Sequence, residues 1–156
     1  MEVAITFTIP KGISDIEPDP LKKIFLHWQK IKGDKFMPCR KDFRPADITM
    51  LLPHVALIDV EHDPRRFRVR LVGTETVKAM GRDVTGWYLD EHPPLFPLIE
   101  RYSWLVDHKS PYLYFGELIW SEKPFLNYYA LGLPFSEDND KVDIIMLGMY
   151  FVYNNK

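Results

Sequence analysis

The run VDIIMLGMYFVY at residues 142–153 decides how this chain folds. Apolar side chains occupy both of its alternating sets: Val142, Ile144, Met146 and Tyr150 form one, and Ile145, Leu147, Met149 and Phe151 form the other. Successive side chains of a strand point to opposite faces of its sheet, so both faces must be covered here. The run therefore predicts a central strand with a packing layer on each side.

Two further strand-like runs precede it, YLYFGELIW at 112–120 and LNYYALGLPF at 126–135, and polar turns separate the three. This is the pattern of a β-meander. Earlier in the chain, the β-branched run 55–61 is followed by a turn at 62–64. Apolar residues then alternate with arginines over 66–71, as in a half-buried strand. We expect these two runs to form a hairpin.

The segment between the hairpin and the meander has apolar residues at helical spacing. Thr74 to Met80 predicts a short helix that ends at Gly81, and the cluster 90–94 opens a longer helix. The apolar stripe of that longer helix comprises Leu95, Leu98, Ile99, Tyr102, Leu105 and Val106. Before the hairpin, residues 19–32 predict a helix with Asp19 as N-cap, and its apolar face comprises Leu21, Ile24, Phe25, Trp28 and Ile31.

The element order predicts an α+β fold. It consists of one five-stranded antiparallel sheet, with helices between strands 2 and 3 and an additional N-terminal helix. Residues 1–18 form an arm and residues 19–156 the domain. One sheet face packs on the middle helices. The other must be covered by the helix 19–32, by the arm, or by a second subunit. This need favours a homodimer through the N-terminal helix or sheet face, or a docked signalling protein.

The composition excludes several classes of protein. Lysine and arginine number 20 against 22 acidic residues, so the basic excess typical of nucleic-acid binding is missing. Cys39 is the only cysteine and cannot form an internal disulfide, and the N-terminus lacks the pattern of a secretory signal. No uncharged apolar run approaches the roughly 18 residues of a membrane span. We expect a cytoplasmic protein with no nucleic-acid partner.

Three stretches of the sequence carry a family resemblance: 37–55, beginning MPCRKDFRPADI; FRVRLVGT at 67–74 with GRDVTG at 81–86; and LPFS at 133–136 with Val142 and Asp143. In this order the chain resembles the PAS domain family, particularly the single-domain PAS proteins of alphaproteobacteria, and the resemblance covers nearly everything after residue 20. Within the first stretch, we expect Arg40, Asp42 and Asp47 to form a charge-assisted network to the hairpin, with Arg70 as partner.

The resemblance implies a sensory or docking domain with a pocket between the sheet and the middle helices. Apolar and hydroxyl-bearing side chains suited to such a pocket are Trp87, Phe96, Ile99, Tyr102, Tyr114, Tyr128 and Met146. The same side chains equally fill a core that has no cavity. With no kinase or DNA-binding segment in the sequence, we expect such a module to act in trans in signal transduction.

Cofactor and enzyme signals are weak. The reactive-cysteine motif of flavin-binding PAS domains is absent, and Cys39 precedes the first core strand. His108 could serve as an axial haem ligand, but we favour the alternative that it stabilises a helix C-terminus. The five histidines lack metal-site spacing, so we expect no metal.

No catalytic motif is visible in the sequence, and we expect that the protein is not an enzyme. The alternatives are a small-molecule enzyme with His108 or Glu117 as base, or a ligand-free adaptor.

Overall fold

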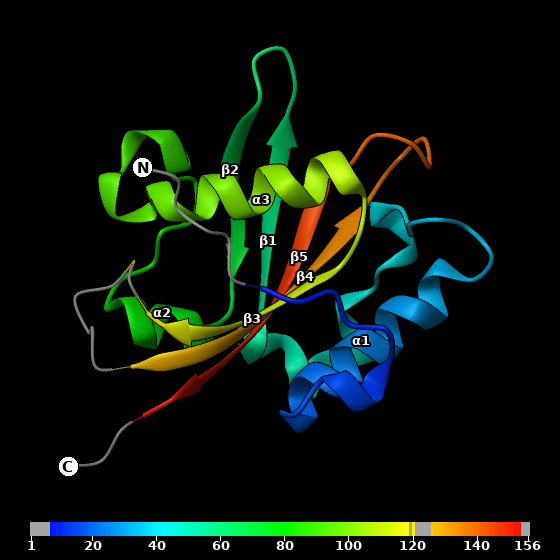
Figure 1. Cartoon of the computed structure of the whole chain (residues 1–156), viewed down its shortest axis with the longest axis horizontal. Coiled ribbons are helices and arrows are strands. Elements are labelled where there is room, and N and C mark those ends of the chain that lie inside the picture. The colour runs from blue at the N-terminus through cyan, green and yellow to red at the C-terminus, as the bar shows by residue number, and fades with distance from the viewer. Residues whose placement is uncertain (1–6, 119, 121–125, 154–156) are drawn as a thin grey trace.

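One antiparallel sheet organises the chain, whose computed structural model describes residues 7–118, 120 and 126–153. Its strands are β1 (Val55–Glu61), β2 (Arg66–Val72), β3 (Tyr112–Glu117), β4 (Asn127–Phe135) and β5 (Ile144–Val152). They lie in the order β2-β1-β5-β4-β3, and every neighbouring pair is antiparallel (Figure 1). The predicted hairpin and meander are confirmed, and strand β5 joins them in the middle of the sheet.

Both faces of β5 are covered, as its sequence predicts. Ile144 and Met146 belong to one buried apolar cluster, whereas Ile145, Leu147 and Met149 belong to a second one. Because successive side chains of a strand point to opposite faces, these two clusters lie on opposite sides of the sheet.

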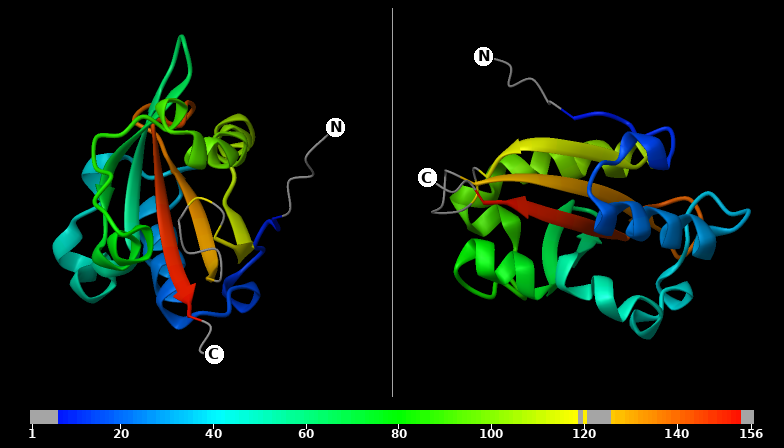
Figure 2. Two further views of the ribbon diagram at one scale, coloured as in Figure 1. Left: turned by 90° about the vertical axis from the view of Figure 1, so that its left-hand side faces the viewer. Right: turned by 90° about the horizontal axis from the view of Figure 1, so that it is seen from below.

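The helices flank the sheet on different sides (Figure 2). Helices α2 (Thr74–Met80) and α3 (Phe96–His108) lie between β2 and β3 in the chain and pack on β5 and β4. Helix α1 (Asp19–Lys32) packs on the same two strands but contributes to the other cluster. Short 3₁₀ segments complete the order: η1 (Ile13–Asp15), η2 (Arg40–Asp42), η3 (Pro45–His54), η4 (Leu89–Glu91) and η5 (Pro93–Leu95). No helix in the described ranges is long and apolar enough to cross a membrane.

Helix α1 is anchored to the sheet by its apolar face. Four residues of this face are buried against β4, β5 and η3: Leu21, Ile24, Phe25 and Trp28. The indole N–H of Trp28 donates a hydrogen bond of 3.0 Å to the carbonyl of Pro134 in β4. Asp19, predicted as the N-cap, is instead the first helical residue and pairs with Lys23. The chain itself thus covers the second sheet face, and no second subunit is needed for that purpose.

The described part of the N-terminal arm packs on the same domain. Thr8 and Leu113 of β3 exchange two backbone hydrogen bonds, at 2.9 and 2.8 Å. The Phe7 ring lies 4.6 Å from that of Trp104 on α3, and Ile16 is fully buried. Residues 1–6 of the predicted arm lie outside the described residues. Residues 7–18 therefore extend the sheet edge and the core.

The hairpin departs from strict alternation at one point. Leu57 pairs with Leu71, but the next residue, Ile58, pairs with Val69, so β2 carries a bulge there. The bulge turns Leu71 outward, and 41% of it is exposed, although the alternating pattern predicts burial. A bulge changes which face a side chain takes without leaving a mark in the apolar pattern.

The segment before β1 is held by Asp42 rather than by the predicted network. Arg40 donates to the carbonyl of Phe43, and Asp47 pairs with Arg44. The expected partner Arg70 instead pairs with Asp59 of β1. The Asp42 carboxylate accepts the backbone N–H of Cys39 at 2.9 Å and its Sγ–H at 3.2 Å, and it also pairs with Lys35.

Replacing the Asp42 carboxylate should lower the stability of the fold at neutral pH and reduce the loss of stability on acidification. The hydrogen bond from Lys35, followed by the one from the Cys39 backbone, lowers the pKa of Asp42 to about 2. Because the folded pKa lies below that of an unfolded aspartate, about 3.9, this stabilisation is complete above pH ~4 and is lost towards pH ~2. We expect Asp42→Asn to lower the free energy of unfolding at pH 7 by about 1–2 kcal/mol.

Urea unfolding at pH 7 and at pH 2.5 measures this effect. The variant should lose less stability between the two pH values than the unmodified chain. Asp34→Asn, at an exposed position nearby, is the control and should leave both values unchanged within about 0.5 kcal/mol. Equal acid sensitivity in the Asp42→Asn variant would contradict the assignment.

Candidate functional site

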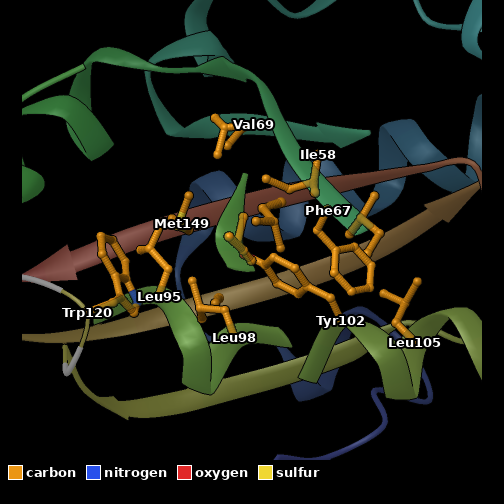
Figure 3. Packing of buried hydrophobic residues seen from close by; sticks show 14 of the residues in the cluster. Ile58, Phe67, Val69, Leu95, Leu98, Tyr102, Leu105, Trp120 and Met149 are labelled. Carbon is orange, nitrogen blue, oxygen red and sulfur yellow. The ribbon is translucent and has the colours of Figure 1, made fainter. Parts of the chain in front are cut away.

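A cavity of about 40 Å³ lies between the sheet and the helices α2 and α3. Ile58, Ala130 and Met149 line it from the sheet, while Met80 and Leu98 line it from the helices. Figure 3 shows Leu98 and Tyr102 pointing from α3 towards the strands that carry Ile58 and Met149. The space exceeds the roughly 10–15 Å³ that one water needs but is far below the 300–1,000 Å³ of drug-sized sites. It therefore suits a small molecule.

One wall of this apolar cavity carries a buried cation. Arg101 is only 7% exposed, yet it lies on the inward stripe of α3 between Leu98 and Leu105. Its Nη1 donates a hydrogen bond of 2.8 Å to the hydroxyl of Tyr128 in β4, and its guanidinium lies 3.8 Å from the ring centroid of Tyr114. No carboxylate in the described part of the chain pairs with it. Among the described residues its charge is met by neutral tyrosines: the Tyr128 hydroxyl, the Tyr114 ring and the nearby phenol of Tyr112.

The Tyr128 hydroxyl receives a second hydrogen bond. The indole N–H of Trp120 donates to it at 2.8 Å. A hydroxyl has two acceptor lone pairs and one O–H donor. With Arg101 and Trp120 donating to the oxygen, the O–H of Tyr128 points elsewhere, and among the described residues it meets no acceptor.

Tyr112 adds a second unpartnered hydroxyl to the same wall. The residue is fully buried and lines the cavity, and its hydroxyl has no hydrogen-bond partner among the described residues. Burial raises its pKa well above the usual value for tyrosine, although the neighbouring Arg101 guanidinium works against the rise. The group therefore remains an O–H donor at neutral pH.

Gly132 fixes the position of the Tyr112 ring. The two residues are paired across β3 and β4, and a Cβ atom on Gly132 would lie 2.2 Å from the ring. Only glycine lets the ring lie across β4 at this position. The local sequence of the meander therefore sets where this hydroxyl stands.

The polar groups that the described cavity wall presents include hydroxyls and one guanidinium, with no carboxylate among them. Tyr102, also on this wall, is buried, and desolvation raises its pKa well above the usual value, so it too stays protonated. Together, the Arg101 guanidinium and the hydroxyls of Tyr112 and Tyr128 form a positively charged, donor-rich group inside an apolar space. Such a group suits an acceptor-bearing molecule that has an apolar part.

The structure brings two of the seven predicted ligand residues to the cavity, Tyr102 and Tyr128. Tyr114 does not line the cavity, but its ring contacts that of Tyr128 and makes a cation–π contact with the guanidinium of Arg101. Ile99 and Trp87 are half-buried on the edge of the same core, and Trp87 stacks on His92 at 3.7 Å. These five therefore share one side of the sheet, but only two line the cavity.

The remaining two predicted ligand residues, Phe96 and Met146, lie away from the cavity. Phe96 begins α3 on its outer side and is 46% exposed. Met146 is fully buried, but in the cluster under α1, because it belongs to the other alternating set of β5. The methionine of β5 that lines the cavity is Met149.

Sequence reasoning missed Arg101, Tyr112, Trp120 and Met149. For Arg101 a signal existed: it is three residues from Leu98 and four from Leu105, so it falls on the apolar stripe of the helix. A charged residue at such a position needs a partner or a function. The other three depend on strand pairing, which brings residues far apart in sequence to the same wall.

The other candidate groups lie away from the cavity. His108 is exposed at the end of α3, where its Nδ1 lies 2.9 Å from the carbonyl of Trp104 and its ring stacks on that indole. Glu117 is exposed on β3. Cys39 is buried in the segment before β1 and bonds to Asp42. Within the described ranges, no group of three or more His, Cys, Asp or Glu side chains is arranged to hold a metal ion.

Comparison with known proteins gives one family match. A family model described as a PAS domain matches residues 16–101, more than half of the chain. The match runs from Ile16, just before α1, through the hairpin to Arg101 on α3. Comparisons with curated proteins and with solved structures gave no match.

Proposed function

This chain belongs to the PAS domain family, whose members are regulatory sensory or interaction domains, and we propose that it senses a small molecule held in the cavity. The loaded or empty state would be passed to a separate signalling protein, so that the domain acts in trans. The observation that carries the proposal is the cavity itself. Its apolar walls enclose polar hydrogens that have no acceptor among the described residues.

The walls of the cavity offer a route for the signal. Ala130 and Tyr128 line the cavity from β4, and the same strand holds Pro134, whose carbonyl accepts the indole hydrogen bond from α1. A ligand that shifts β4 would therefore also change the seating of α1 on the other face. This continuity supports α1 as the element that reports the state of the cavity.

The surface open to a partner differs from the one that the apolar pattern suggests. Phe25 and Trp28 are buried inside the chain, so a homodimer through the N-terminal helix would have to use its outer side. Leu26 on that side is 46% exposed, and the loop and 3₁₀ residues Phe36 and Met50 are 79% and 87% exposed. We propose these three as contacts for a second copy or a signalling partner.

The rival functions gain little support from the placement of their residues. An enzyme with His108 or Glu117 as base would need these groups beside a bound substrate, and both lie on the surface away from the cavity. A ligand-free adaptor needs no cavity, and the space beside Arg101 counts against it. The sensor proposal accounts for both the space and the buried polar groups.

Native mass spectrometry of the protein purified from its own source tests the proposal, with an absorbance spectrum of the same sample to detect haem or flavin. We expect a mass above that of the polypeptide that is lost on denaturation. Leu98→Phe, which fills the cavity from α3, should abolish the added mass. The same spectra report whether the chain is a dimer.

Phe96→Ala is the matched control, because Phe96 is on the same helix but is exposed and does not line the cavity. This variant should keep the added mass. A bare polypeptide mass from the unmodified chain would overturn the sensor proposal and favour the adaptor. An added mass that Leu98→Phe retains would place the ligand outside the cavity.

A further inference from the structure

The polar groups of the cavity wall select the chemistry of the ligand. Arg101 contributes a full positive charge at 7% exposure, and neither a described carboxylate nor bulk water neutralises it. Removing an ionised group from water is unfavourable unless the group is paired. Within the described part of the chain, this guanidinium is surrounded by neutral tyrosines, Tyr112, Tyr114 and Tyr128, and has no anionic partner.

Two hydroxyls point to the same missing partner independently of the charge. Among the described residues, the buried Tyr112 hydroxyl has no partner, and the Tyr128 O–H, whose oxygen accepts from Trp120 and Arg101, has no acceptor. A buried donor left without an acceptor destabilises the folded state. The guanidinium and both hydroxyls would be satisfied by a single group that carries two acceptor oxygens.

We propose, on the basis of the proposed sensory function, that the cavity binds a small monocarboxylate with a short apolar tail. The carboxylate accepts from Arg101, Tyr112 and Tyr128, and the tail lies between Leu98, Ala130 and Met149. The single positive charge favours a monoanion over a dianion, and a space of about 40 Å³ favours a short chain. The apolar walls leave the tail no hydrogen-bonding role.

Isothermal titration calorimetry at pH 7 with butyrate and with its neutral isostere butyramide tests this inference. We expect butyrate to bind and butyramide to bind at least tenfold more weakly, because only the anion pairs with the guanidinium. Leu98→Phe should abolish binding of butyrate, and the exposed control Phe96→Ala should leave it unchanged.

Two variants separate ligand binding from folding. Arg101→Met removes the charge but keeps a side chain of similar length, and it should weaken butyrate binding by about 10- to 100-fold. The affinity of Arg101→Lys should lie between those of Arg101→Met and the unmodified chain. Tyr112→Phe removes a hydroxyl that has no described partner, so thermal stability without ligand should not fall. Its affinity for butyrate should nevertheless fall about tenfold. This second variant keeps the test valid even if Arg101→Met does not fold.

The outcomes distinguish this inference from the sensory function. Equal binding of butyrate and butyramide, both blocked by Leu98→Phe, would overturn the anion assignment and leave the cavity as a ligand site. Unchanged butyrate affinity in Arg101→Met or Tyr112→Phe would also overturn it. No binding of either compound, together with a bare native mass, would overturn both proposals.

Discussion

Trp28→Ala is expected to lower the free energy of unfolding by about 3–5 kcal/mol, the range for removing a large buried aromatic side chain. The indole is 5% exposed, lies 6.0 Å from the Phe25 ring between centroids, and fills the contact between α1 and the sheet. Its removal leaves a cavity there. It also leaves the Pro134 carbonyl without the indole donor, and a buried unsatisfied group costs more than its hydrogen bond contributed.

Chemical unfolding followed by circular dichroism measures this loss. Trp28→Phe separates its two parts, because it keeps most of the packing and removes only the indole N–H, so it should cost about 1–3 kcal/mol. Gln29→Ala, exposed on the same helix, should change stability by no more than about 0.5 kcal/mol. A Trp28→Ala variant as stable as the Gln29→Ala control would show that α1 is not anchored in this way.

Gly73→Ala should destabilise the chain by about 2–3 kcal/mol through a steric clash alone. Gly73 joins β2 to α2, and its φ of −73° suits any residue. An added Cβ, however, would lie 2.4 Å from the carbonyl oxygen of Leu52 and 2.5 Å from that of Pro53. Both are backbone atoms at the end of η3, so neither can move aside as a flexible side chain would.

The consequence extends to the cavity, because α2 contributes Thr76 and Met80 to its wall. We therefore expect Gly73→Ala to weaken binding of any cavity ligand as well as to lower the thermal midpoint. Gly12→Ala is the matched control, since nothing lies within 4 Å of an added Cβ there. A thermal midpoint of Gly73→Ala that matches this control would contradict the close approach of β2–α2 to η3.

Membership of the PAS domain family relates the variants of Trp28, Arg101 and Leu98 to the proposed sensory function. The sheet of this PAS domain separates the cavity on one face from α1 on the other, and β4 contacts both. If the proposed sensory function holds, variants of Trp28 would act on the output side and variants of Arg101 or Leu98 on the input side. Comparing them in one binding assay with a signalling partner would show whether the two sides are coupled.

The sequence by itself determined the element order, the strand pairing of hairpin and meander, and the central place of β5. These follow from local signals: alternation of period two, the helical stripe, and glycine after the short helix. The run 142–153 also predicted cover on both faces, because a strand that is apolar on both sets cannot face water. The sequence does not decide, however, whether α1, the arm or a second subunit covers the second face.

Tertiary structure alone decided the site. Met146 and Met149 are equally apolar in sequence, and only the orientation of β5 shows that Met149 faces the cavity. Likewise Tyr112, Tyr128 and Arg101 come from three different elements, and strand pairing and helix packing bring their polar groups to one wall. Periodicity tells which side chains turn inward along one element, but which inward side chains meet depends on packing between elements distant in the chain.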